Sequence, residues 1–196
     1  MSERHVIRTI GLPDRGSYAI AVVSDTHGRP HPSLVPTLKE RRPALILHAG
    51  DVGGLQLVTE LEKVGPTVYV RGNVDPAGSP WPDSLSLHLT WGLAGKLDLL
   101  LLHAAATHLR LNRDALSLLR QYPAQIVVFG HSHIPFLGMD GKVCLFNPGS
   151  AGPARWGLPI TMGIIELGPD QPVFKHLDLR TGKPWKPDVR DHGNAP

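Results

Sequence analysis

The stretch "QIVVFGHSH", residues 125–133, carries the signal on which the fold assignment of this chain depends. Its apolar run, 126–129, predicts a short buried strand. The run leads directly into Gly130, His131, Ser132 and His133, so that two histidines stand at positions i and i+2. Such a pair can bind a metal ion, because imidazole is a common metal ligand, but the pair alone is weak evidence. The ends of the other apolar runs therefore decide between a metal site and a chance pair.

Five further apolar runs also end in polar side chains or in a polar loop. In chain order they end at Asp25 with His27, at Asp51, at Asn73, at His103 and at the loop 147–150. In open α/β sheets the carboxyl ends of the strands line the ligand crevice. We therefore expect these side chains, which lie far apart in the sequence, to converge on one place.

The apolar periodicity predicts an α/β fold with two sheets. Strands over 18–25, 44–51 and 67–73 alternate with helices over 33–42 and 55–64, an order that favours a parallel sheet. A hairpin over 84–91 and 93–103 is expected to start a second sheet, which is followed by a helix over 112–122. Four more strands are expected over 125–130, 142–147, 160–167 and 172–179. Ser33 and Asn112 are the predicted helix N-caps, and Pro36 must then lie in a first turn.

Length and composition favour one globular domain. The chain has 196 residues, of which 41% are hydrophobic, and we assign 17–179 to the domain, 1–16 to an N-terminal extension and 180–196 to a polar tail. The longest apolar stretch, 97–106, is too short to cross a bilayer, and the N-terminus lacks the apolar core of a signal peptide. A cytoplasmic location without membrane contact is expected. Cys144 is the only cysteine, which excludes a disulfide framework and a thiolate zinc cluster.

The positive charge lies mainly near the two ends of the chain. The formal net charge is +3, of which residues 1–16 contribute +1 and residues 175–196 contribute +2. A nucleic-acid-binding domain normally carries a basic stripe on its folded surface. The neutral body makes nucleic acid an unexpected partner and argues against a nuclease.

The polar side chains at the strand ends form a set typical of a two-metal site. It consists of two aspartates, one asparagine and four histidines, namely Asp25, Asp51, Asn73, His27, His103, His131 and His133. Seven ligands are too many for one tetrahedral ion, but they suit two ions that share one carboxylate. Such pairs promote in-line displacement at phosphorus. The mixed nitrogen and oxygen donors accept several divalent ions; Mn²⁺ is the first expectation, with Ni²⁺, Fe²⁺, Zn²⁺ and Mg²⁺ as alternatives.

The ordered motifs "SDTHG", "HAGD", "RGNVD", "GHSH" and "NPGS" resemble those of the calcineurin-like metallophosphoesterases, in particular the small bacterial and archaeal phosphodiesterase branch. The resemblance covers about 19–167 and implies a four-layer αββα sandwich of two mixed β-sheets flanked by helices, the fold of the Vps29-like proteins. It implies that Asp25, His27 and His133 hold one ion, that Asn73, His103 and His131 hold the other, and that Asp51 bridges them. The loop 147–150 would be structural and would face the substrate.

The expected function is a metal-dependent phosphodiesterase that hydrolyses a small phosphodiester. A hydroxide bridging two divalent ions would attack phosphorus opposite the leaving alcohol. Asp51, Asn73 and His103 would act through the ions. Arg155 is the candidate phosphate clamp, because a guanidinium can hold two oxygens at once, with Arg71 and Arg29 as weaker candidates.

Two departures from the family pattern concern the catalytic groups. Many relatives carry a second histidine where this chain has Ala105, and His108 is an alternative for that position. The large phosphatases of the superfamily carry a histidine after Gly-Asn, where this chain has Val74 followed by Asp75. The identity of the leaving-group acid is therefore open.

Other interpretations remain open from the sequence. His103 could be an inert core histidine, and His48, inside an apolar run, is expected to pack in the core. The chain could be a Vps29-like protein-interaction scaffold with a vestigial metal site, or a phosphomonoesterase or nucleotide pyrophosphatase. The physiological substrate, the native metal and a homo-oligomeric state are not determined by the sequence.

Overall fold

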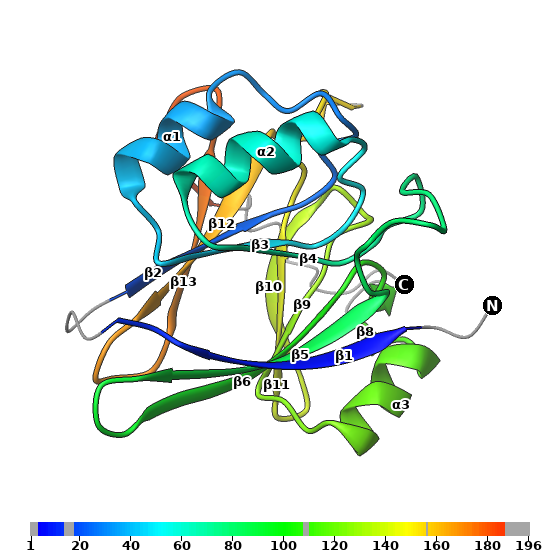
Figure 1. Ribbon diagram of the computed structural model, residues 1–196, viewed down its shortest axis with the longest axis vertical. Coiled ribbons are helices and arrows are strands. Elements are labelled where there is room, and N and C mark those ends of the chain that lie inside the picture. Colours follow the sequence, from blue (N-terminus) through cyan, green and yellow to red (C-terminus); the bar gives the residue numbers. More distant parts are fainter. Residues whose placement is uncertain (1–3, 14–17, 108–109, 156, 187–196) are drawn as a thin grey trace, which may run out of the picture.

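Two six-stranded β-sheets pack face to face and carry helices on their outer faces (Figure 1). The computed structural model describes residues 4–13, 18–107, 110–155 and 157–186. In spatial order the first sheet contains β1 (His5–Gly11), β5 (Ser84–Trp91), β6 (Gly95–Leu102), β9 (Ile126–Val128), β11 (Val143–Pro148) and β10 (Pro135–Asp140). The second contains β14 (Pro184–Trp185), β13 (Val173–Asp178), β12 (Thr161–Leu167), β2 (Tyr18–Val23), β3 (Leu45–His48) and β4 (Thr67–Tyr69).

The helices complete a four-layer αββα sandwich, which confirms the expected fold class. Helices α1 (Leu34–Arg41) and α2 (Leu55–Val64) cover the outer face of the second sheet, and α3 (Arg113–Gln121) lies against the first sheet (Figure 1). A short two-stranded pair, β7 (Ala106–Thr107) and β8 (Arg110–Leu111), precedes α3. No helix in the described part of the chain is long and apolar enough to cross a membrane.

Three apolar layers hold the four layers of secondary structure together. Between the sheets lie side chains such as Ile20, Leu87, Leu99 and Phe146, all almost completely buried. Separate clusters join α1 and α2 to the second sheet and α3 to the first. Central strands such as β2, β3 and β9 are thus apolar on both faces, because water is excluded from both sides.

The expected βαβαβ unit is present. Strands β2, β3 and β4 are parallel neighbours joined by α1 and α2, and β5 and β6 form the expected antiparallel hairpin. Asn112 caps α3, because its Oδ1 accepts a hydrogen bond from the Ala115 amide at 2.8 Å. Ser33 stands at the N-cap position of α1, but its side chain makes no capping hydrogen bond with the described residues. Pro36 lies in the first turn of that helix, as required.

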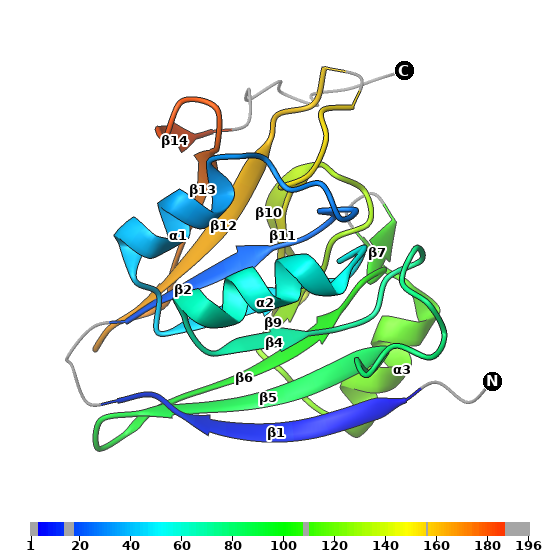
Figure 2. The same ribbon diagram turned by 45° about the horizontal axis from the view of Figure 1, so that its top comes forward.

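Several strands lie outside the elements predicted from the sequence. Residues assigned to an N-terminal extension contain β1, which pairs in parallel with β5 along the outer edge of the first sheet (Figure 2). Strand β10 forms the opposite edge by pairing with β11. The segment assigned to the polar tail contains β14, where the Trp185 ring contacts His176 of β13 with the ring centroids 5.7 Å apart.

Candidate metal centre

The seven predicted ligands lie in loops at one end of the sandwich, where the two sheets meet. Five of the six apolar runs end there in predicted ligands: after β2, β3 and β4 of the second sheet and after β6 and β9 of the first. The ligands are, in that order, Asp25 with His27, Asp51, Asn73, His103, and His131 with His133. Convergence follows from the parallel arrangement, because the carboxyl ends of parallel strands share one edge of a sheet.

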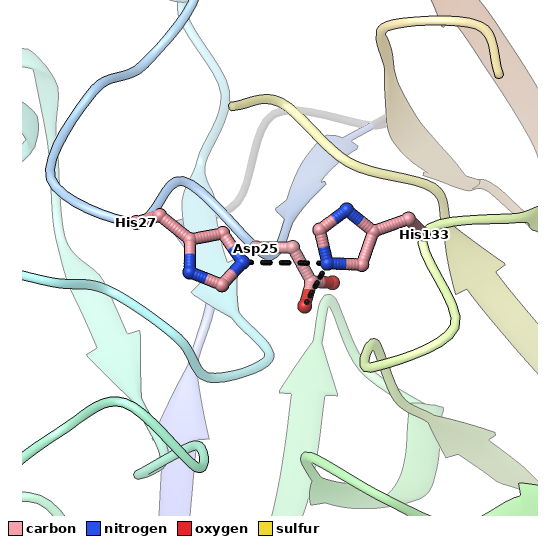
Figure 3. Close-up of side chains that lie close together, drawn as sticks. All are labelled: Asp25, His27 and His133. Carbon is pink, nitrogen blue, oxygen red and sulfur yellow. Dashed lines mark hydrogen bonds and ion pairs between the residues drawn. The ribbon is translucent and has the colours of Figure 1, made fainter. Parts of the chain in front are cut away.

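The first group of side chains consists of Asp25, His27 and His133 (Figure 3). The Nε2 atoms of the two imidazoles lie 3.3 Å apart, and Nε2 of His133 lies 3.3 Å from Oδ1 of Asp25. The ligand atoms of all three residues lie within 4.8 Å of one another. This spacing fits three donors around a single cation, and the group is the predicted first-ion set.

Asp51 joins this group to a second one. Its Oδ2 atom lies 3.6 Å from Nε2 of His27 and 3.5 Å from Nε2 of His103. The second group of mutually close donors is Asp25, Asp51 and His103. The same carboxylate oxygen of Asp51 therefore faces an imidazole of the first group and an imidazole of the second, which is the position required of a bridging ligand.

Asn73 and His131 lie on the exposed side of the second group. The Asn73 amide nitrogen lies 3.5 Å from Nδ1 of His131, and the rings of His131 and His103 meet edge to face with centroids 5.2 Å apart. Asp25, Asp51, His103 and His133 are buried, whereas Asn73 and His131 face solvent. The structure thus brings all seven residues into one cluster with an open side.

Two buried polar atoms of the cluster suit a cation. Oδ1 of Asp25 and Nε2 of His103 have no hydrogen-bond partner among the described residues. Nδ1 of His103 lies 2.8 Å from the carbonyl oxygen of Ala49, to which it donates, so Nε2 is the nitrogen that faces Asp51 and that a cation would use. Burial acts to lower the pKa of His103, but the contact with Asp51 outweighs it and raises that pKa, which favours a proton on Nε2 where no cation is bound. Buried polar atoms without a hydrogen-bond partner are costly, and a bound cation would satisfy both. His103 therefore differs from a core histidine with both ring nitrogens hydrogen-bonded, because its Nε2 atom faces the cluster without a hydrogen-bond partner among the described residues.

The two carboxylates of the cluster titrate in opposite directions. Burial raises the pKa of Asp25 to about 6, although the charge of His103 opposes this shift. Burial also acts to raise the pKa of Asp51, but the adjacent imidazole of His103 and the amide of Val74 outweigh it and hold that pKa well below its usual range. Asp51 is consequently ionised at neutral pH even without a cation.

Three of the four imidazoles are kept neutral. Burial lowers the pKa of His27 and of His131, and burial together with the positive charge of Arg155 lowers the pKa of His133 to about 4. A histidine must be neutral to bind a metal, because the proton occupies the lone pair that the metal uses. These shifts favour metal binding near neutral pH.

Five of the seven cluster residues have a left-handed backbone conformation. Asp25, His27, Asp51, His131 and His133 have φ angles of 55°, 49°, 55°, 68° and 60°. Each such conformation costs about 1–3 kcal/mol in a residue with a side chain and is typical of functional sites. Arg42, which ends α1, is the other non-glycine residue with positive φ in the described ranges. The loops are thus held in conformations that serve the side-chain arrangement.

Hydrogen bonds between the loops stabilise these conformations. The amides of Asp25 and His27 donate to the carbonyl oxygens of Gly50 and Asp51, at 3.0 and 2.9 Å. The amide of His131 donates to Oδ2 of Asp25 at 3.1 Å and so ties the end of β9 to the end of β2. Contacts with another loop therefore help to offset the strain in each loop.

Asp75, whose role the sequence left open, supports these loops. It is buried, and its carboxylate accepts hydrogen bonds from the amides of Val52, Gly53 and Gly72 at 3.1, 2.9 and 2.8 Å. The carboxylate is thereby committed to backbone donors, so Asp75 is not placed as a leaving-group acid. In the sequence Asp75 directly follows Gly72, Asn73 and Val74. That position alone does not distinguish an aspartate that supports other loops from an ordinary turn aspartate.

Two glycines allow the close approach of the loops. A Cβ atom on Gly72 would lie 2.2 Å from the nitrogen and from Oδ1 of Asp51. A Cβ atom on Gly50, where φ is +89°, would lie 2.6 Å from Nδ1 of His103. Any side chain at either position would displace a predicted ligand.

The loop 147–150 has the structural role expected of it. The buried Asn147 amide donates to the Gly130 carbonyl oxygen at 2.7 Å and so anchors the turn that carries His131 and His133. The Ser150 hydroxyl donates to the carbonyl oxygen of Asp25 at 3.0 Å. The loop therefore holds both turns that supply the first group.

Of the predicted arginines, Arg155 lies at the cluster. It is exposed, and its Nη2 atom lies 3.4 Å from Nε2 of His27. Arg71 instead pairs with Asp83, to which its Nε donates at 2.6 Å, and Arg29 is exposed.

His48 is completely buried and hydrogen-bonded to Thr26 at 2.9 Å, as expected of a core residue. His108, the alternative histidine, lies outside the described residues.

The chain belongs to the calcineurin-like phosphoesterase superfamily, whose family model matches residues 19–170. Among its relatives, a probable metallophosphoesterase of Methanothermobacter thermautotrophicus is 31% identical over 169 residues, which cover 84% of this chain and 94% of that protein. The family is metal-dependent, and the fold and the donor cluster agree with this assignment.

Solved structures share the fold. Vps29 of Entamoeba histolytica, in a complex with Zn²⁺, has a TM-score of 0.67 at 21% identity and covers 85% of this chain and 96% of its own. The phosphoesterase YfcE of Escherichia coli has a TM-score of 0.59 at 22% identity and covers 85% of this chain and 96% of its own. At this level of identity the likeness concerns the fold.

Proposed function

We propose that this chain is a phosphodiesterase that works with two divalent ions. Asp25, His27 and His133 would hold one ion and Asn73, His103 and His131 the other, with Asp51 between them. The observation that carries the proposal is the position of Asp51 Oδ2, which lies 3.6 Å from His27 Nε2 and 3.5 Å from His103 Nε2. A single carboxylate oxygen that faces two imidazoles suits a bridge between two ions.

The chemistry follows from this donor set. Two bound ions supply an activated water near neutral pH and neutralise charge on the phosphoryl oxygens. Asp51 keeps the two sites together, and neutral Asn73 adds no negative charge that would weaken the attraction for phosphate. Arg155 at the open side of the cluster is the proposed phosphate clamp, because its guanidinium can donate two parallel hydrogen bonds.

The open side supports a diester substrate. A pocket of about 210 Å³ lies beside His103 and Asn73 and gives room for one alcohol group, while the exposed side of the cluster at His131 leaves room for the second alcohol group of a diester. Mn²⁺ is the proposed ion because the mixed nitrogen and oxygen donors, without thiolate, suit it. Zn²⁺ is the alternative, since a Vps29 of the same fold has been solved with it.

A protein-interaction scaffold with a vestigial metal site is the competing proposal. It is disfavoured because all seven predicted ligand positions are filled and lie in one cluster. A vestigial site is expected to lose at least one donor, or to carry a hydrogen bond in its place.

The test is hydrolysis of bis-p-nitrophenyl phosphate by the purified full chain, together with metal analysis. We expect chelation to abolish the activity, Mn²⁺ to restore it, and the metal content to approach two ions per chain. Phosphomonoesters assayed under the same conditions should be poorer substrates. The proposal fails if the metal-loaded protein hydrolyses no phosphodiester, or if the Asp51→Asn protein retains both ions.

A further inference from the structure

A small side pocket opens beside the second group of the metal centre. It has a volume of about 210 Å³, and Asn73 and His103 form its wall toward the cluster. This volume is below the range of about 300–1,000 Å³ typical of sites for drug-sized ligands. The pocket can therefore take one compact group attached to a phosphate that lies at the cluster.

Two leucine side chains contribute apolar surface to the pocket lining. Leu102, at the end of β6, is buried, and Leu118 of α3 is half-buried. These two side chains can pack against the carbon skeleton of a ligand and exclude water from it. The polar groups of the pocket must then determine which substituents the ligand carries.

Arg71 provides the hydrogen-bond donors of the pocket. Its Nε donates to Oδ1 of Asp83 at 2.6 Å, its Nη2 pairs with the same oxygen, and the other oxygen of Asp83 accepts from the Arg4 amide at 2.9 Å. The guanidinium is thereby fixed in place and its charge is compensated. Because a guanidinium has five N–H donors, some remain for a ligand oxygen.

The charge of the pocket disfavours a second anionic group. Its lining contains the Arg71 guanidinium, the Asp83 carboxylate that pairs with it, and the carboxylate of Asp114. Asp114 is exposed in the first turn of α3 and has no ion-pair partner among the described residues. Within the lining two carboxylates stand against one guanidinium, and Asp25, Asp51 and the first phosphate compensate the charge of the two proposed ions. A second phosphate would therefore meet net repulsion from the lining, whereas a hydroxyl could accept from Arg71 and donate to Asp114.

We infer that this side pocket binds one alcohol group of the ester and selects a compact, uncharged, hydroxyl-bearing group over one that carries a second phosphate. The inference rests on the proposed function, which places the phosphate at the metal centre, and it deepens that function by naming the substrate class. It predicts a diester of small hydroxylated alcohols rather than a pyrophosphate or a bisphosphate.

Three phosphate monoesters that differ in one terminal group test the inference. Propyl phosphate, 3-hydroxypropyl phosphate and propane-1,3-diol bisphosphate are compared as inhibitors of bis-p-nitrophenyl phosphate hydrolysis and, by calorimetry, as ligands of the Mn²⁺-loaded protein. We expect the hydroxypropyl ester to bind about three- to tenfold more tightly than the propyl ester, the value of one hydrogen bond. The bisphosphate can bind through either of its two equivalent ends. After its measured affinity is corrected for this twofold statistical factor, it should bind no more tightly than propyl phosphate.

Two variants assign these preferences to residues. Arg71→Met should remove the preference for the hydroxyl group. Asp114→Lys, at an exposed position, should strengthen bisphosphate binding relative to propyl phosphate by about threefold or more. Asp170→Lys is the matched control, because Asp170 is exposed in the turn after β12, at the opposite end of the strand from the loop 147–150. It should leave the ratios of the three ligands as they are in the natural protein.

The outcomes separate the inference from the proposed function. The inference is overturned if the bisphosphate is the tightest ligand of the natural protein, or if Asp114→Lys changes the ratios no more than Asp170→Lys does. Failure to hydrolyse any diester overturns the proposed function instead, and calorimetry then still ranks the three ligands. If the protein hydrolyses diesters and the three ligands bind in the expected order of affinity, both the inference and the proposed function are supported.

Discussion

Oδ2 of Asp51 lies 3.5 Å from Nε2 of His103, although the two residues follow strands of different sheets. The opposite ring nitrogen of His103 donates to the Ala49 carbonyl oxygen, so Nε2 is the nitrogen left to face Asp51. This contact joins the second sheet to the first at the metal centre. The functional cluster therefore depends on how the two sheets pack and not on one motif.

Asp51→Asn should remove the bridging charge. Residues that only hydrogen-bond to a metal ligand usually contribute about 10–100-fold in metal affinity or activity. Because Asp51 is itself a proposed ligand, we expect its change to lower phosphodiesterase activity by at least about a hundredfold. Metal content, measured on the purified protein, should fall with it. Asp98→Asn is the matched control, because Asp98 pairs with His88 at 2.6 Å in a half-buried position outside the cluster.

Asp25→Asn should stabilise the metal-free protein at alkaline pH. Below the ordinary pKa of 3.8 the carboxyl is protonated in the folded and the unfolded chain, and above about 6 it is ionised in both. Because burial raises the folded-state pKa, the folded state loses up to about 3 kcal/mol of stability as the pH rises through this window. The variant, which carries no charge, avoids this loss.

Thermal unfolding with chelator at pH 4 and pH 8 measures the effect of Asp25→Asn. The gain of the variant over the natural protein should be larger at pH 8. Addition of Mn²⁺ should raise the melting temperature of the natural protein and have little effect on the variant. A variant that is less stable than the natural protein at both pH values would contradict the assigned shift.

Arg155→Ala should weaken substrate binding without loss of metal. The guanidinium lies at the open side of the cluster, 3.4 Å from Nε2 of His27. Loss of a charge-assisted hydrogen bond predicts a rise in KM of about tenfold or more. Arg155→Lys should restore little of this, because an ammonium cannot donate two parallel hydrogen bonds. Arg120→Ala, at an exposed site on α3, is the control and should leave KM unchanged.

Gly72→Ala should destabilise the fold and displace Asp51. The added Cβ would lie 2.2 Å from two atoms of that residue, and overpacking of this kind typically costs about 1–3 kcal/mol. Denaturant unfolding and metal titration measure the two effects. Gly78→Ala is the comparison, because no described atom lies within 4 Å of its added Cβ. Equal stability of the two variants would show that the loop can yield at Gly72.

From the sequence alone, the central elements of the fold and a candidate donor set could be predicted. The βαβαβ pattern, the β5–β6 hairpin and the positions of Asp25, Asp51 and His103 at strand ends could all be derived from apolar periodicity. The reason is local: alternation and run length define a strand, and polar residues that follow it must lie where the strand ends. The four-layer arrangement came from the family resemblance, and the structure confirms it.

The tertiary structure alone decided how the donors are held. Strand β1 is rich in β-branched residues, but only its parallel pairing with β5 shows that it belongs to the first sheet. Asp75 closes its own turn by accepting from the Gly72 amide, and it also supports the loop after β3, because the amides of Val52 and Gly53 donate to its carboxylate. The left-handed conformations at Asp25, His27, Asp51, His131 and His133 are unfavourable locally and are stabilised by contacts between loops, and such non-local contacts leave no periodic trace in a sequence.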